Sequence, residues 1–103
     1  MVDVTLDEAD GSTFLVKLQA ESWELNIRAS ATDLMRLRDI RDADWDARRS
    51  LAIGTCAGAG VFWAMSGDRV AILVGSDDET WDIAVAVPPA AVDEIVTRAA
   101  SSS

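Results

Sequence analysis

Three apolar segments between residues 61 and 85 constrain the fold of this chain more than any other feature of its sequence. The segments Val61–Met65, Val70–Val74 and Trp81–Val85 are separated by short turns that contain glycine, serine and acidic residues. Turns this short join antiparallel neighbours, because a parallel connection needs a crossover of about a dozen residues or more. The sequence therefore predicts a three-strand antiparallel meander.

The turns also predict how the three strands pair. A type II′ turn places glycine first, so Gly67-Asp68 is expected to form a two-residue loop between the first two strands. A four-residue loop at residues 76–79 would join the second strand to the third. Together the two registers place three wholly apolar cross-strand rows on one face of the meander. The rows are Val61 with Val74 and Trp81, Trp63 with Ile72 and Ile83, and Met65 with Val70 and Val85.

The first half of the chain predicts further strands, because apolar and polar residues alternate there with a period of two. The expected strands are residues 2–6, 13–18 and 23–28, with a short one at 50–53. Residues 42–49 are too polar for a buried strand and are expected to form a loop, and the glycine-rich residues 54–60 a flexible connection.

Two helices complete the predicted fold. A sequence that resembles a capping box begins at Ser30, and the helix that it starts is expected to end near Ala43. Pro88-Pro89 would stop the last strand and begin a C-terminal helix over Ala90–Ala99. We therefore predict an α+β fold, in which one central and one C-terminal helix pack on an antiparallel sheet of six to seven strands.

The chain has 103 residues, which is the size of one domain. We expect a single domain over residues 1–100 and a polar serine tail at 101–103 that frays. No apolar run reaches the roughly 18 residues that span a bilayer, and the first residues lack the features of a signal peptide. A single cysteine, Cys56, permits no internal disulfide. These features predict a cytoplasmic protein.

The net charge of the chain narrows the classes of molecule that it can bind. Eighteen acidic and nine basic residues give a formal net charge of −9. Such a surface repels polyanions, so binding to nucleic acid or to an anionic membrane is not expected. It attracts a basic protein and speeds the encounter, although the same charge is also a common route to solubility alone.

The composition argues against an enzyme. The chain contains no histidine and no tyrosine, so a Ser-His-Asp or Cys-His triad cannot be assembled. Cys56 has no histidine partner and is interpreted as a small buried thiol. The nearby glycines precede a strand rather than the helix that a phosphate-binding loop needs. We predict no catalytic residue and no cofactor.

Four carboxylates gather at the second turn of the meander. They are Asp77, Asp78, Glu79 and Asp82. Their number would suit calcium, but the spacing is not that of an EF-hand, and we predict no metal site. The alternatives are a solvated turn and an acidic projection that docks on a basic partner. For the second reading we name Asp77, Asp78 and Glu79 as partner-binding residues.

Trp45 is the fourth candidate for partner binding. It lies between Asp44 and Asp46 and is followed by Arg48, so it does not belong to any apolar face that would be buried in the core. Tryptophan is enriched at the energetic centres of protein interfaces. Trp45 is therefore expected to anchor a partner.

The block from Gly60 to Val96 resembles small bacterial immunity proteins of polymorphic toxin systems, and is closest to the first-numbered immunity family. The resemblance covers about a third of the chain. It rests on a Gly-Val-Phe-Trp strand, a Gly-Asp turn, a Val-Ala-Ile-Leu-Val strand and a Val-Pro-Pro-Ala-Ala-Val helix start. It implies an α+β domain that binds and neutralises a toxin in the cytoplasm, and it assigns no role to any residue.

These observations predict a non-enzymatic, acidic protein-binding module, with inhibition of a partner toxin as the role that the resemblance implies. The alternative is a structural homo-oligomer, such as a homodimer, in which a sheet edge or the exposed face around Phe62 and Leu73 packs on a second copy.

Overall fold

A computed structural model describes residues 2–77 and 79–102. Seven strands form one antiparallel sheet whose spatial order follows the chain, from β1 to β7. The strands are β1 Asp3–Asp10, β2 Thr13–Gln19, β3 Glu24–Ser30, β4 Leu51–Cys56, β5 Ala59–Ser66, β6 Arg69–Gly75 and β7 Trp81–Val87. Helices pack on this sheet, so the predicted α+β class is confirmed.

The helices differ in detail from the prediction. They are α1 Ala31–Met35, the 3-10 helices η1 Arg36–Asp42 and η2 Trp45–Ala47, and α2 Pro89–Ser102. The side chain of Ser30 accepts a hydrogen bond of 3.1 Å from the amide of Asp33, so the central helix begins where the sequence predicts. After the five residues of α1 the helix tightens into the 3-10 helix η1. Short η2 occupies the stretch expected to be loop, and α2 continues into the serine tail through Ser102.

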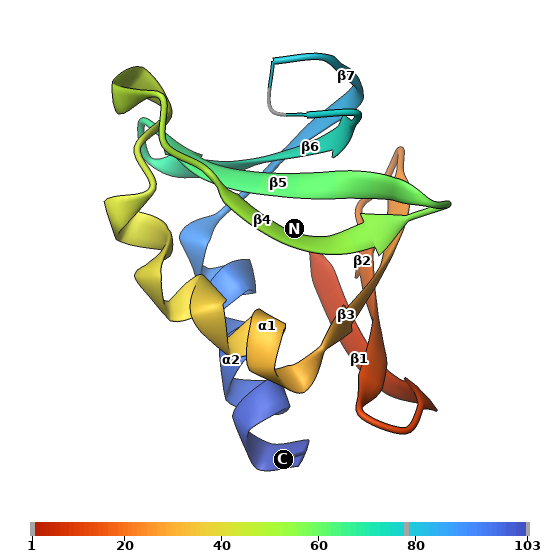
Figure 1. The fold of residues 1–103 in the computed structure, drawn as a ribbon. Helices are drawn as coiled ribbons and strands as arrows, with labels where there is room; N and C mark the ends of the chain where they lie inside the picture. The colour runs from red at the N-terminus through yellow and green to blue at the C-terminus, as the bar shows by residue number, and fades with distance from the viewer. Residues whose placement is uncertain (1, 78, 103) are drawn as a thin grey trace.

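The sheet bends sharply between β3 and β4, which are joined by the single residue pair Arg28 and Thr55. Figure 1 shows α1 and α2 beneath β4 and β5 and beside β1 to β3, on the inner side of this bend. At the bend Gly54 has a φ of +84°, and the backbone of β3 lies against its Cα. A residue without a side chain is therefore required at this position.

Gly54→Ala is expected to destabilise the protein strongly. A Cβ atom at residue 54 would lie 2.6 Å from a methyl group of Ile27 and 2.8 Å from the backbone oxygen of Arg28. Overpacking and the positive φ together should cost about 2–4 kcal/mol. Gly58→Ala is the matched control, because φ is +85° there and nothing lies within 4 Å of the added atom. Its cost should be about 1 kcal/mol. Equal midpoints for the two variants in guanidinium denaturation would contradict this account of the bend.

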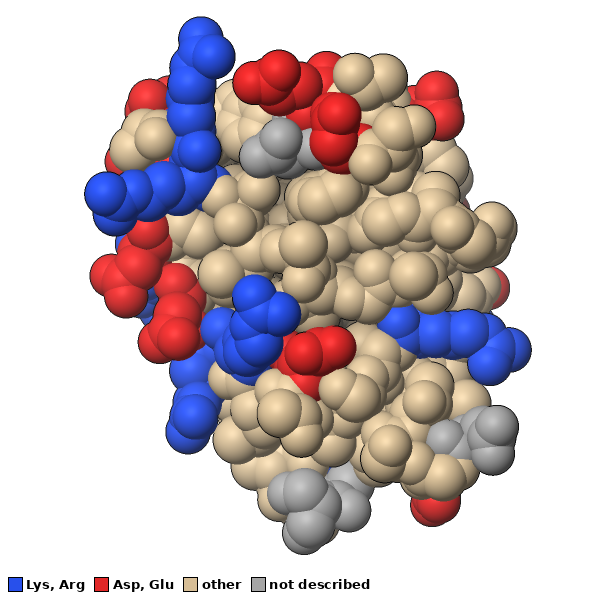
Figure 2. Space-filling model, in the orientation of Figure 1, with Lys and Arg blue, Asp and Glu red and all other residues tan. Residues whose placement is uncertain are grey.

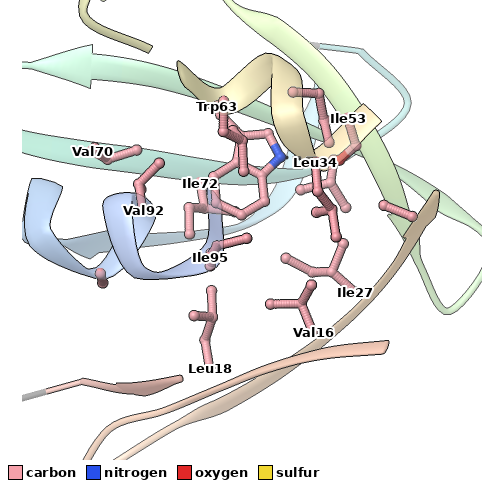
Figure 3. Packing of buried hydrophobic residues seen from close by; sticks show 14 of the residues in the cluster. Val16, Leu18, Ile27, Leu34, Ile53, Trp63, Val70, Ile72, Val92 and Ile95 are labelled. Atoms are coloured by element: carbon pink, nitrogen blue, oxygen red, sulfur yellow. Dashed lines mark hydrogen bonds between the residues drawn. The ribbon is translucent and has the colours of Figure 1, made fainter. Parts of the chain in front are cut away.

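Trp63 lies at the centre of the core. Its side chain is fully buried, and its indole nitrogen donates a 3.0 Å hydrogen bond to the carbonyl oxygen of Ile53. In Figure 3 the ring is surrounded by side chains from both halves of the sheet and from α2, among them Ile72 and Ile95. The bond satisfies the polar end of the ring, so the whole indole can be buried at little cost.

An exposed ion pair joins the central helix to α2. Two nitrogens of Arg41 lie 3.4 and 3.3 Å from the two carboxylate oxygens of Asp93. The hydrogen bond to Asp93, and then its charge, raise the pKa of Arg41 above its ordinary value. These two hydrogen bonds help to set the orientation of α2 relative to the central helix. They add little to the free energy of unfolding, because an exposed ion pair contributes little to stability.

The predicted pairing of β5 with β6 is confirmed. Ser66 lies opposite Arg69 across the loop, and Gly67 has the positive φ, +64°, that the first position of a type II′ turn requires. Trp63 lies opposite Ile72, as predicted. The stretch from 54 to 60, expected to be a flexible connection, is instead part of a β4–β5 hairpin, in which Ala57 and Gly58 form the turn with positive φ values.

The predicted pairing of β6 with β7 is wrong by two residues. Val74 lies opposite Ile83 rather than Trp81, and Val70 opposite Val87 rather than Val85. The cause is a longer loop and an irregularity of the ladder between Val74 and Gly75. A shift of two keeps Ile83 and Val85 on the inner face. Only the end of β7 near α2 is covered, however, so Val87 is fully buried while Ile83 is 46% exposed.

Candidate functional site

Two tryptophans far apart in the sequence meet at one surface groove. The groove has a volume of about 490 Å³ and lies between η2 and the β6–β7 loop. Figure 1 shows both segments on the side of the sheet away from α1 and α2. We call this site the tryptophan groove. It is lined by Trp45, Asp46, Arg48, Glu79 and Trp81.

The irregularity in β7 places Trp81 in the groove. Trp81 pairs with Gly75, which shares the outer face of β6 with Leu73 because side chains alternate along a strand. A Cβ atom at residue 75 would lie 2.4 Å from the Cα of Trp81, so only glycine allows this approach. Trp81 was predicted to lie on the core face. It lies on the outer face instead, and 43% of its surface is exposed.

Local hydrogen bonds position Trp45 on the other side of the groove. The carboxylate of Asp44 accepts from the amide of Asp46 at 3.0 Å and caps η2. The amide of Met65 on β5 donates to the carbonyl oxygen of Ala43 at 2.7 Å, which ties this segment to the sheet. Trp45 is half-buried, so part of its surface remains accessible.

The β6–β7 loop is organised by one of its own carboxylates. Asp77 Oδ1 accepts hydrogen bonds from the amides of Glu79 at 2.8 Å and of Thr80 at 2.6 Å. Asp77 therefore shapes the loop as well as carrying charge. Glu79 lines the groove, whereas Asp77 does not, and Asp78 lies outside the described residues.

Charges of both signs border the groove. Figure 2 shows acidic side chains along the upper edge of the molecule, over the β6–β7 loop, with basic side chains beside them at the upper left. Arg48 Nη1 lies 4.0 Å from Glu79 Oε1, and these side chains are 89% and 78% exposed. This is a long, solvated ion pair that holds the two sides of the groove together only weakly.

The structure thus brings together two of the four predicted partner-binding residues, Trp45 and Glu79, in the lining of one groove. Trp81 was not predicted to line the site, because its apolar neighbours at alternate positions indicated a place in the core. The signal that pointed to the surface was Gly75, since an isolated glycine at the end of a strand favours a bulge. Asp46 and Arg48 were noted only as the polar setting of Trp45.

Other candidate features lie away from the groove. Cys56 is half-buried at the end of β4, where a small thiol packs against the edge of the core. Within residues 2–77 and 79–102, no three Cys, Asp or Glu side chains are placed to share a metal ion. In the same part of the chain, no helix is both long enough and apolar enough to cross a lipid bilayer.

Comparison of the chain with protein-family models, with curated proteins and with solved structures finds no match. The resemblance to immunity proteins therefore stays a prediction, and the groove must be interpreted from its own chemistry.

Proposed function

We propose that this chain is a non-enzymatic protein-binding module that docks the tryptophan groove and the adjacent β6–β7 loop on a basic surface of a partner protein. The observation that carries the proposal is the meeting of accessible Trp45 and Trp81 with the carboxylate of Glu79 at one groove. Aromatic anchors beside charged groups are the usual energetic centre of a protein interface.

The charge of the molecule supports the same proposal. A net charge of −9 attracts a basic partner over several ångströms, and the acidic loop beside the groove would orient it on arrival. The groove then supplies affinity, because removing indole surface from water is favourable. The long-range attraction of the acidic loop and the burial of the indole rings thus favour docking at the same site.

The finer role that we propose is inhibition. If the resemblance to immunity proteins holds, the partner is a toxin of the same cell, and binding blocks its activity. The partner expressed alone should then arrest growth, and co-expression of this chain should restore it. Growth arrest that persists despite complex formation would leave binding in place and remove the inhibitory role.

A charge-matched capture experiment tests the proposed surface. Asp77→Asn/Glu79→Gln and the control Asp7→Asn/Glu8→Gln, on exposed positions of β1, both change the net charge from −9 to −7. The asparagine at 77 keeps the oxygen that accepts from the loop amides. We expect the partner captured by the native chain at low salt to be lost with the first variant and kept with the second. Equal loss with both would show that only overall charge matters, and no partner at low salt would contradict the proposal.

Homo-oligomerisation stays as a second candidate, because β7 is an edge strand of mostly apolar residues that are largely exposed. Ile83 is 46% exposed, and Ala84 and Ala86 are exposed beside it. Such an edge is suited to pairing with another strand. The version that uses Leu73 is weakened, since Leu73 is already buried within one copy. A monomer by light scattering would remove this candidate, whereas a dimer broken by Ile83→Lys would favour it.

A further inference from the structure

Arg48 lines the groove and forms a weak ion pair with Glu79 there, which indicates the kind of group that this carboxylate can receive. We propose that the tryptophan groove is a subsite for the guanidinium of a partner's arginine, and that Arg48 is an internal competitor that the incoming arginine displaces from Glu79. This inference rests on the proposed function and specifies the chemistry of its contact.

The lining of the groove matches a guanidinium. Trp45 and Trp81 both line the groove and are partly exposed, and an indole ring can stack on a planar cation, a contact that arginine makes more often than lysine. Glu79 and Asp46 supply carboxylates beside the rings, and a carboxylate pairs with guanidinium through parallel hydrogen bonds. Among the described residues that line the groove, Arg48 supplies the positive charge.

The backbone of η2 aims Arg48 at this subsite. Arg48 has a φ of +57°, a left-handed conformation that is unfavourable for residues other than glycine. Its amide donates to the carbonyl oxygen of Trp45 at 2.9 Å, and the amide of Arg49 donates to that of Asp44 at 3.0 Å, so the conformation is held in place. The resulting turn returns the side chain of Arg48 toward Glu79 across the groove.

The contact that Arg48 makes is weak enough to be exchanged. The two charged atoms are 4.0 Å apart and both side chains are largely in water, so the pair is worth little. An arginine from a partner would meet the same carboxylate while covering the indole faces, which removes the water that screens the pair. The internal pair can thus give way to an incoming arginine at little cost.

Titration with short peptides tests the inference directly. The probes are acetyl-Gly-Arg-Gly-amide and its lysine and citrulline analogues, and the readout is the set of indole N–H signals of Trp45 and Trp81 in ¹H–¹⁵N spectra. Arg48→Ala frees Glu79. Arg49→Ala changes the net charge equally, from −9 to −10, and residue 49 does not line the groove.

We expect the arginine peptide to shift both indole signals saturably in the native chain. Arg48→Ala should lower its Kd about two- to fivefold, the size expected for loss of an exposed competing ion pair, and Arg49→Ala should leave it unchanged. Glu79→Gln should weaken binding, and the neutral citrulline peptide should not saturate. Equal Kd values for the two arginine variants would overturn the role of Arg48. A lysine peptide that binds as tightly as the arginine peptide would overturn the specificity for guanidinium.

The proposed function does not fail if the arginine subsite does. If a captured partner binds the native chain and is lost after substitution of Trp81, while no arginine peptide shifts the indole signals, the groove is an interface that contacts something other than arginine. If the peptides bind as expected but no partner is captured, the subsite exists and the proposed function fails.

Discussion

Trp63→Ala is expected to cost about 4–6 kcal/mol in the free energy of unfolding, which approaches the whole stability of a domain of this size. Removal of a buried tryptophan leaves a cavity between the two halves of the sheet, and such truncations cost about 3–5 kcal/mol. The carbonyl oxygen of Ile53 also loses its donor in the interior, which adds about 1 kcal/mol or more. The variant should therefore lose a large part of the native stability at 25 °C.

Guanidinium denaturation followed by circular dichroism measures this effect without relying on the tryptophan signal. Trp63→Phe keeps most of the ring but not the donor, and should cost about 1–3 kcal/mol. Trp23→Ala, at a half-buried position next to β3, should cost less than Trp63→Ala. A Trp63→Ala variant as stable as Trp23→Ala would show that Trp63 is not the centre of the core.

Trp81→Ala is expected to weaken partner binding at least 30-fold, about 2 kcal/mol, because tryptophans at interface centres contribute disproportionately. The substitution removes one side of the tryptophan groove and leaves the carboxylates in place. Isothermal titration calorimetry with the captured partner measures the change, after thermal denaturation has confirmed that the variant is folded.

Ile83→Ala is the matched control for this measurement. Ile83 lies two residues away on the same strand and is exposed to a similar extent, 46% against 43%, but it faces the other side of the sheet. Its substitution should change the Kd by less than about threefold. If Ile83→Ala weakens binding as much as Trp81→Ala, the partner pairs with the edge of β7 rather than with the groove.

Local pattern was enough to predict most of the fold. Leu25 and Ile27 alternate with polar residues and are buried on β3, and the glycine of the β5–β6 turn set that register correctly. The β6–β7 register was not predictable in this way. Asp77 closes the loop through its side chain, and Gly75 admits Trp81 against the backbone, so the pairing depends on contacts between residues that no periodicity displays.

Only part of the candidate site could be predicted, because local pattern again identified single residues but not the contacts between them. Trp45 stood out because polar residues surround it, and Glu79 because it belongs to an acidic turn. Trp81 was assigned to the core because it continues the alternation of Ile83 and Val85, and the irregularity that turns Trp81 to the outer face leaves no mark in that alternation. The folded sheet brings η2 and the β6–β7 loop together. Residues more than 30 positions apart in the sequence therefore line one groove, which no local pattern could predict.

Fluorine NMR of the chain labelled with 5-fluorotryptophan, alone and bound to the captured partner, tests the central claim most directly. The four tryptophans should give four signals that single Trp→Phe substitutions assign. We predict that the signals of Trp45 and Trp81 shift or broaden on complex formation, while those of Trp23 and Trp63 keep their positions. A complex in which the signals of Trp45 and Trp81 are unchanged would contradict the assignment of the groove as the binding surface.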